Sequence, residues 1–194
     1  MSQKPAPTDL SKLSIRGEYE RHGAEGYYDE FGAVYRNPHE AIVIECLRFA
    51  VAQWPVDLSN VLDLACGSGE ATLALRELGA GRIDGVDPYT TDAYFARTAV
   101  VAERIAFAEI SAGAVRDRRY SLMVCSFALH LCEPSRLPGL MYALGQIGDD
   151  LLVITPHKRP EIRKSWGWEK VGESLIERVR VRHYRTVARR SPGT

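Results

Sequence analysis

The feature that most constrains the fold is the ten-residue stretch VLDLACGSGE, residues 61–70. Its first half is a short apolar run, which is typical of a buried strand. Its second half is a glycine turn, and residues 71–75 (ATLAL) then read as the start of a helix. The two glycines let a ligand approach the backbone closely, and a helix N-terminus offers free N–H groups. The stretch therefore predicts a strand–turn–helix unit with a ligand site at the turn.

Strands and helices alternate on both sides of this unit. A helix over 38–54 precedes it, with Asn37 as a candidate cap, Pro38 at the first helical position and Pro55 as its end. Residues 174–187 alternate between two faces, as a half-buried strand does. Strands are predicted over 60–65, 82–86, 105–109, 121–126 and 151–155, and helices over 70–78, 91–102, 136–147 and, as a short one, 161–166.

This order of elements predicts an α/β fold. The sheet is doubly wound and mostly parallel, with helices on both faces and an antiparallel edge strand or hairpin at the C-terminus. The 194 residues suffice for a single domain with a sizeable core. We expect one domain over 9–190, a disordered tail over 1–8 and a second tail over 191–194.

In such a sheet, ligands bind at the carboxyl ends of the strands, where the strand order reverses. Asp87 follows the second strand, 18 residues beyond Gly69, close to the spacing at which an acid meets ribose hydroxyls. The dinucleotide fingerprint G-x-G-x-x-G/A is incomplete, because Thr72 stands at its third position. A dinucleotide oxidoreductase is therefore disfavoured, while a ribose-containing ligand remains favoured.

The stretch VLDLACGSG resembles the first motif of class I S-adenosylmethionine (SAM)-dependent methyltransferases, D/E-x-G-x-G-x-G. Asp63, Gly67 and Gly69 match the motif, and Ala65 stands at the position of its first glycine. The resemblance covers roughly residues 55–157. It implies a Rossmann-like sheet, SAM as the cofactor, S-adenosylhomocysteine (SAH) as the product, and transfer of a methyl group by in-line displacement.

The resemblance also implies which residues hold the cofactor. Asp87 corresponds to the ribose ligand, Tyr89 is a candidate for stacking on adenine, and the segment after the third strand meets the adenine amino group, through Ile110 backbone groups assisted by Glu109 or Ser111. Backbone groups of the fourth motif face the methionine end. The candidate set from these loops is Asp63, Ala65, Cys66, Gly67, Gly69, Asp87, Pro88, Tyr89, Glu109, Ile110, Cys125 and Ser126.

His130 is the candidate catalytic residue, because it follows the fourth strand and titrates near neutral pH. A purely packing role is the alternative, since an activated methyl group does not require a dedicated base. Residues 9–36, rich in aromatic side chains, are expected to form a lid in which Tyr28 or Arg36 binds the carboxylate of the cofactor. Their alternative role is to cover the sheet edge.

The formal net charge is zero, but from residue 158 onward eleven Lys and Arg residues stand against four Glu residues. We expect a small-molecule acceptor, and an RNA methyltransferase that uses this basic region is the alternative. A non-catalytic partner subunit with the same fold is a third interpretation. The four cysteines lack metal-ligand spacing, so no metal is expected. No apolar run predicts a membrane helix, and the sequence favours a cytoplasmic protein.

Overall fold

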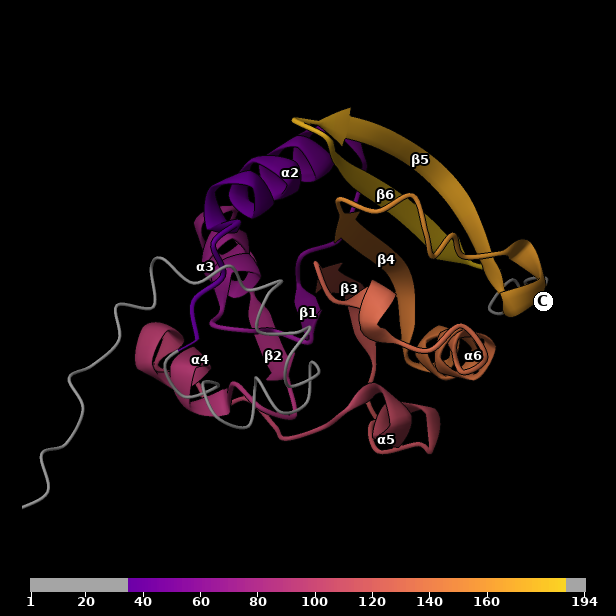
Figure 1. The fold of residues 1–194 in the computed structure, drawn as a ribbon, viewed down its shortest axis with the longest axis horizontal. Helices are drawn as coiled ribbons and strands as arrows, with labels where there is room; N and C mark the ends of the chain where they lie inside the picture. Colours follow the sequence, from indigo (N-terminus) through magenta and orange to yellow (C-terminus); the bar gives the residue numbers. More distant parts are fainter. Residues whose placement is uncertain (1–34, 188–194) are drawn as a thin grey trace, which may run out of the picture.

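The computed structural model describes residues 35–187. They form a six-stranded sheet with the order β2-β1-β3-β4-β6-β5 (Figure 1). The first four strands in the chain are parallel to one another. β6 runs antiparallel to β4, and β5 pairs antiparallel with β6 at the edge of the sheet. The strands are β1 (Asn60–Leu64), β2 (Arg82–Val86), β3 (Tyr120–Ser126), β4 (Gly148–Thr155), β5 (Trp168–Ile176) and β6 (Val179–Thr186).

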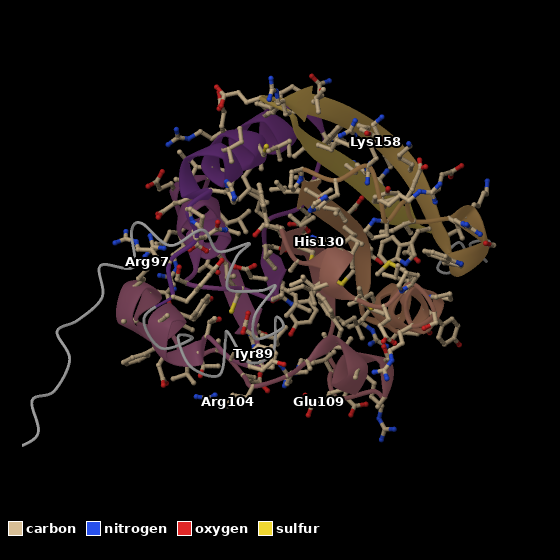
Figure 2. The ribbon with its side chains drawn as sticks, in the orientation of Figure 1. Tyr89, Arg97, Arg104, Glu109, His130 and Lys158 are labelled. Atoms are coloured by element: carbon tan, nitrogen blue, oxygen red, sulfur yellow. The ribbon has the colours of Figure 1, made fainter. Side chains whose placement is uncertain are left out.

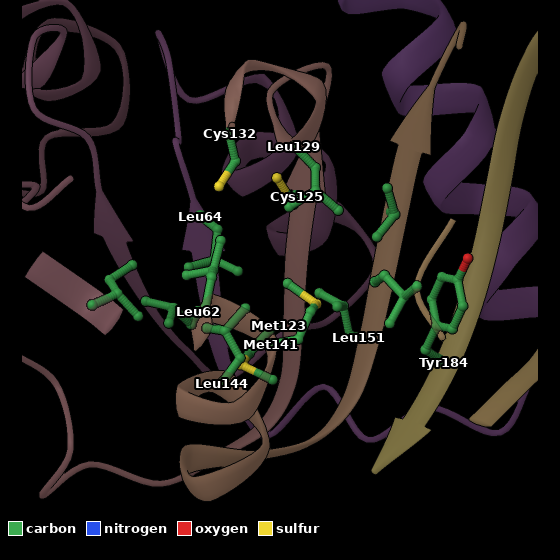
Figure 3. Close-up of a cluster of buried hydrophobic side chains, with 14 of the residues drawn as sticks. Leu62, Leu64, Met123, Cys125, Leu129, Cys132, Met141, Leu144, Leu151 and Tyr184 are labelled. Carbon is green, nitrogen blue, oxygen red and sulfur yellow. The ribbon is translucent and has the colours of Figure 1, made fainter. Parts of the chain in front are cut away.

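Helices cover both faces of the sheet, as expected for a doubly wound fold (Figure 1). On one face α2 and α3 pack against strand residues such as Val61 and Val124. On the other face α5 and α6 pack against Leu62 and Met123 (Figure 3). The helices are α2 (Glu40–Gln53), α3 (Glu70–Glu77), α4 (Thr91–Thr98), α5 (Phe107–Ser111) and α6 (Leu137–Ile147), with 3-10 turns η3 (Leu129–Leu131) and η4 (Lys164–Trp166).

The strand order reverses at β1. Its neighbour on one side is β2, and its neighbour on the other side is β3, both parallel to it. The loops that leave β1 and β3 consequently diverge to opposite sides of the sheet and open a crevice at the carboxyl ends of the strands. This places the glycine turn after Leu64 beside the segment after Ser126.

The predicted strand over 105–109 is wrong. A single parallel bridge joins Val86 to Glu103, before this range, and the chain then forms the short helix α5 from Phe107. The Glu109 carboxylate accepts a hydrogen bond from the N–H of Ala106 at 2.8 Å, which satisfies a backbone donor at the start of this helix. The apolar residues Ile105 and Phe107 pack against the core from this irregular segment rather than from a strand.

The predicted helix over 91–102 is also shorter than expected. It ends at Thr98, because Ala99 adopts a left-handed conformation with φ of 57°. The alternating segment 174–187 spans a turn between two strands rather than one strand. Glu177 and Arg178 have φ of 45° and 72°, which suits a two-residue hairpin turn, and the hairpin alternative is confirmed.

Most of the predicted lid and both predicted tails lie outside the described residues. Among residues 35–187, no helix has the length and apolarity that crossing a membrane requires.

A buried carboxylate links three elements of the core. Asp63, on β1, is 0% exposed, and its Oδ2 accepts a hydrogen bond from Thr72 Oγ1 of α3 at 2.8 Å. Thr72 Oγ1 lies 2.9 Å from the hydroxyl of Tyr94 on α4. Asp63 Oδ1 has no hydrogen-bond partner in the described part of the chain. Burial is the main cause that raises the pKa of Asp63 to about 7.

This raised pKa makes a prediction about stability. The folded state holds the proton of Asp63 up to about pH 7, while the unfolded chain releases it near the ordinary carboxyl pKa of 3.8. The contribution of Asp63 to stability is therefore complete at low pH and is lost as the pH rises toward 7. Between about pH 5 and pH 7 the wild-type free energy of unfolding should fall by roughly 2 to 3 kcal/mol more than that of Asp63→Asn.

Urea unfolding of both proteins at several pH values measures this difference. Because the comparison cancels the titration of the histidines, equal pH slopes in the two proteins would show that Asp63 is ionised in the folded state at acidic pH.

Candidate functional site

A cavity of about 680 Å³ opens at the carboxyl ends of β1, β2 and β3. Its walls come from the glycine turn, the loop after β2, the segment around α5, the loop after β3 and the residues that lead into α2. The residues that line the cavity include Tyr35, Asn37, Ala65, Gly67, Glu70, Asp87, Pro88, Tyr89, Ile105, Phe107, Ile110, Ser111, Ser126, Phe127, Ala128 and Leu131. The crevice at the reversal of strand order is thus the candidate site.

The glycine turn uses backbone conformations that suit glycine. Gly67 and Gly69 have φ of 54° and 86°, and Ala65, where the methyltransferase motif has its first glycine, has φ of 53°. A Cβ atom added at Gly69 would lie 2.5 Å from the Thr98 side chain, so this glycine lets α3 approach α4. Gly67 instead lines the cavity. The two glycines therefore serve different purposes, helix packing and access to the backbone.

Asp87 ties the loop after β2 to the glycine turn. Its Oδ1 accepts hydrogen bonds from the N–H groups of Tyr89 and Thr90, each at 2.9 Å. Its Oδ2 accepts from the N–H of Gly67 at 3.2 Å. Thr90 Oγ1 returns a hydrogen bond to the carbonyl of Gly67 at 2.8 Å. Asp87 is only 7% exposed, yet it lines the cavity, and its carboxylate retains acceptor capacity for a hydroxyl.

The wall formed by the loop after β2 and by α5 is mostly apolar. Pro88 and Tyr89 line it from the loop after β2, and Ile110 and Ser111 from α5. Glu109 does not line it, because its carboxylate caps the start of α5 and is exposed. Figure 2 shows Tyr89 and Glu109 on their separate elements. Of the candidates for the adenine end, Glu109 is thus the one that the structure leaves outside the cavity.

Several other candidates have side chains that serve the core. Asp63, Cys66, Gly69 and Cys125 do not line the cavity, while Ser126, next to Cys125, does. Burial raises the pKa of Cys125 to about 12, and it raises the pKa of the Cys66 thiol as well. Both thiols remain protonated at physiological pH and pack as small apolar groups. All four cysteines are free, and no group of metal ligands occurs within residues 35–187.

His130 lies in η3, between Ala128 and Leu131 of the cavity wall, but does not itself line the cavity (Figure 2). The centre of its ring is 4.3 Å from that of His157, which follows β4. Its Nδ1 is buried and has no hydrogen-bond partner among the described residues. Burial, and then the charge of His157, lowers the pKa of His130 to about 4. The imidazole is therefore neutral at physiological pH.

The structure describes only the last two residues of the predicted lid, 35 and 36. Tyr28 lies outside the described residues, and Arg36 is an exposed side chain 3.7 Å from Glu40 that does not line the cavity. Tyr35 and Asn37, on either side of Arg36, line it instead. Asn37 does not cap α2, whose N-cap is His39, but its Oδ1 accepts a hydrogen bond from the His39 N–H at 2.9 Å.

Glu70 is the functional candidate that the sequence reasoning missed. It is the first residue of α3, it is 2% exposed, and it lines the cavity. Its signal in the sequence was its place directly after Gly69, where an acid also suits the first turn of a helix. Because this role at the helix start accounts for an acid at position 70, the sequence alone did not indicate that Glu70 also lines the cavity.

These walls fit SAM. They combine backbone groups of a glycine turn, a carboxylate at the end of β2 and apolar side chains beyond it, which match the charged methionine part, the ribose and the adenine of one ligand.

Comparisons with known proteins agree with this fit. A methyltransferase domain family model matches residues 61–146. An uncharacterised protein of Schizosaccharomyces pombe, C17A5.05c, is 32% identical, and the match covers 80% of this chain and 80% of that one.

Solved structures share the fold at low identity. The magnesium protoporphyrin IX methyltransferase ChlM of Synechocystis PCC 6803, with bound SAM, matches with a TM-score of 0.59 and 14% identity over 91% of this chain and 99% of that one. The CcbJ methyltransferase of Streptomyces caelestis matches with a TM-score of 0.64 and 17% identity, over 84% and 98%. With the domain match and the motif, they lead to one conclusion: the chain belongs to the class I SAM-dependent methyltransferases.

Proposed function

We propose that the chain transfers the methyl group of SAM to a small-molecule acceptor by in-line displacement. The observation that carries the proposal is the cavity, whose volume of about 680 Å³ falls within the range of small-molecule sites. The cavity is continuous from the apolar wall formed by the loop after β2 and α5 to Ser126, Phe127 and Ala128 at the end of β3. One ligand-sized space thus adjoins both the cofactor residues and the loop that carries His130.

In this proposal the chain mainly binds and orients. Bound SAM supplies an electrophilic methyl group on a sulfonium. Asp87 accepts hydrogen bonds from the ribose, Gly67 allows the close approach of the backbone, and Pro88, Tyr89 and Ile110 enclose the adenine and exclude water. A protonated acceptor loses one proton on methylation, and His130, whose imidazole is neutral, is the proposed group that receives it.

Part of the basic C-terminal region is engaged in contacts within the hairpin. Arg182 is 3% exposed, and it donates hydrogen bonds to the carbonyls of Lys158 and Pro160 at 2.8 and 3.0 Å. Glu173 pairs with Arg182 at 3.3 Å and with Arg180 at 3.2 Å. Two of the three alternating arginines are therefore held by the hairpin itself.

A labelled-methyl assay separates the acceptor classes. Extract is divided into small molecules and RNA, and each fraction is incubated with the protein and SAM. We expect label in the small-molecule fraction. Label in RNA, with RNA binding that weakens steeply between about 50 and 300 mM salt, would favour the RNA alternative.

Asp87→Ala should weaken SAM binding, because the ribose hydroxyls lose a charged acceptor. We expect the Kd to rise by roughly 5- to 100-fold, which corresponds to about 1 to 3 kcal/mol. Isothermal titration calorimetry measures the change. Asp92→Ala, on the exposed first turn of α4, is the matched control and should bind SAM as the wild type does. An unchanged Kd in Asp87→Ala would remove this residue from the site. If the wild type binds no SAM, the non-catalytic alternative is favoured.

His130→Gln should lower turnover by about 100-fold and leave the Kd for SAM nearly unchanged, as expected for a residue that only receives a proton. Because the pKa of His130 is about 4, the wild-type rate should not change with the protonation of His130 between about pH 6 and 8. His157→Gln removes a nearby charge, so it should raise the pKa of His130 and move the acid limb of the pH–rate profile upward. Wild-type turnover in His130→Gln would leave the residue a packing role.

A further inference from the structure

Two carboxylates flank the glycine turn, and only one of them reaches the cavity. Asp63 is 0% exposed and is turned toward Thr72 in the core, so it does not line the wall. Glu70 is almost as deeply buried, at 2% exposed, but it does line the wall. The acid of the sequence motif and the acid of the cavity wall are therefore different residues.

The contacts of Glu70 leave one of its oxygens for a ligand. Oε1 accepts hydrogen bonds from the N–H of Asn37 at 3.2 Å, from Arg97 Nη1 at 3.3 Å and from Ser68 Oγ. Within residues 35–187, no hydrogen bond to Oε2 occurs. Oε2 lies on the side of Gly67, 3.4 Å from where a Cβ atom of that residue would be. A carboxylate oxygen that no protein donor contacts, on a residue of the cavity wall, can accept a hydrogen bond from a cationic donor of a ligand.

The surrounding charges favour a cation at this oxygen. Arg97 is shared, since its Nη1 contacts Glu70 and its Nη2 contacts Glu40. One guanidinium thus faces two carboxylates, which leaves a formal charge of about −1. The other nearby cation, Arg36, is 71% exposed and lies 3.7 Å from Glu40. A ligand carboxylate would be repelled here, whereas an ammonium, with three N–H donors, fits.

Gly67 lies between Glu70 and Asp87. Its N–H donates to Asp87 Oδ2, and the position of its missing Cβ is next to Glu70 Oε2. The two carboxylates therefore adjoin the same residue of the turn. If Asp87 holds the ribose of a ligand, Glu70 is adjacent to the group that continues from the ribose.

From this geometry we propose that Glu70, and not Asp63, holds the α-ammonium group in the methionine part of SAM. The inference rests on the proposed function, because it takes SAM as the ligand and Asp87 as the ribose residue. In this assignment Arg97 is a positioning residue, which fixes Glu70 through Oε1 and leaves Oε2 toward the cavity.

The test compares two ligands that differ only in the amino-acid part. SAH carries the α-ammonium, whereas 5′-methylthioadenosine has the same adenosine and a thioether but no amino acid. In Glu70→Gln the Kd for SAH should rise by about 10- to 100-fold, while the Kd for methylthioadenosine should change by less than about twofold. Asp87→Ala is the matched control, and it should weaken both ligands.

Each outcome decides between the assignments. Equal losses for both ligands in Glu70→Gln would mean that Glu70 only supports the turn, and an unchanged Kd for SAH would also overturn the proposal. If the wild type binds neither ligand, the proposed function itself fails.

A second measurement uses only the wild type, so it tests the proposal even if Glu70→Gln does not fold. The wild type should bind SAH that lacks its carboxylate about as tightly as SAH, and SAH that lacks its amino group at least about tenfold more weakly. Equal weakening by the two analogues would contradict the assignment of an ammonium site.

Discussion

The site depends on the hydrogen bonds that the Asp87 carboxylate accepts from backbone N–H groups. Two of them hold its own loop, and the third joins it to Gly67 in the turn after β1. Two loops from neighbouring strands thereby become one wall of the cavity. The arrangement requires β1 and β2 to be adjacent and parallel, because only then do their carboxyl ends lie at the same edge. A substitution at Asp87 therefore acts on the proposed ligand contact and on the shape of the turn together.

Three carboxylates surround this turn, and their environments give them different properties. Asp63 is enclosed by core atoms and prefers its neutral form, since burial raises its pKa to about 7. Asp87 is held by backbone donors that face its charge. Glu70 shares Arg97 with Glu40, lines the cavity, and has one oxygen next to Gly67. Burial alone does not decide which acid meets a ligand; what decides is the direction of the carboxylate and the donors already bound to it.

Much of this fold could be predicted from the sequence, because a strand–turn–helix unit and regular alternation each have a strong pattern. The strand over 105–109 could not, since a short apolar run suits a strand or a helix equally well, and pairing with Val86 extends only to Glu103. Within the site, sequence spacing predicted Asp87, and this residue lines the cavity. Asp63, which was predicted with it, does not line the cavity, because spacing does not say where a side chain points. The direction of Asp63 follows from alternation along β1. Leu62 and Leu64 share one face of the sheet, so Asp63 and Val61 point to the other face, where Thr72 of α3 donates to Asp63.

In the C-terminal region, the number of charged residues also says little about the contacts that they make. Eleven basic residues against four acidic ones imply a strongly positive surface. In the hairpin, however, Arg182 is buried against two carbonyls, and Glu173 contacts Arg180, Arg182 and Lys170. One carboxylate offsets one positive charge, so Glu173 leaves part of the charge of these three side chains uncompensated. The hydrogen bonds of Arg182 to two carbonyls fix its guanidinium without cancelling its charge. Pairing and salt screening reduce the attraction of a polyanion to this hairpin below what the residue count suggests. The proposal of a small-molecule acceptor therefore rests on the walls of the cavity and not on the charge of the hairpin.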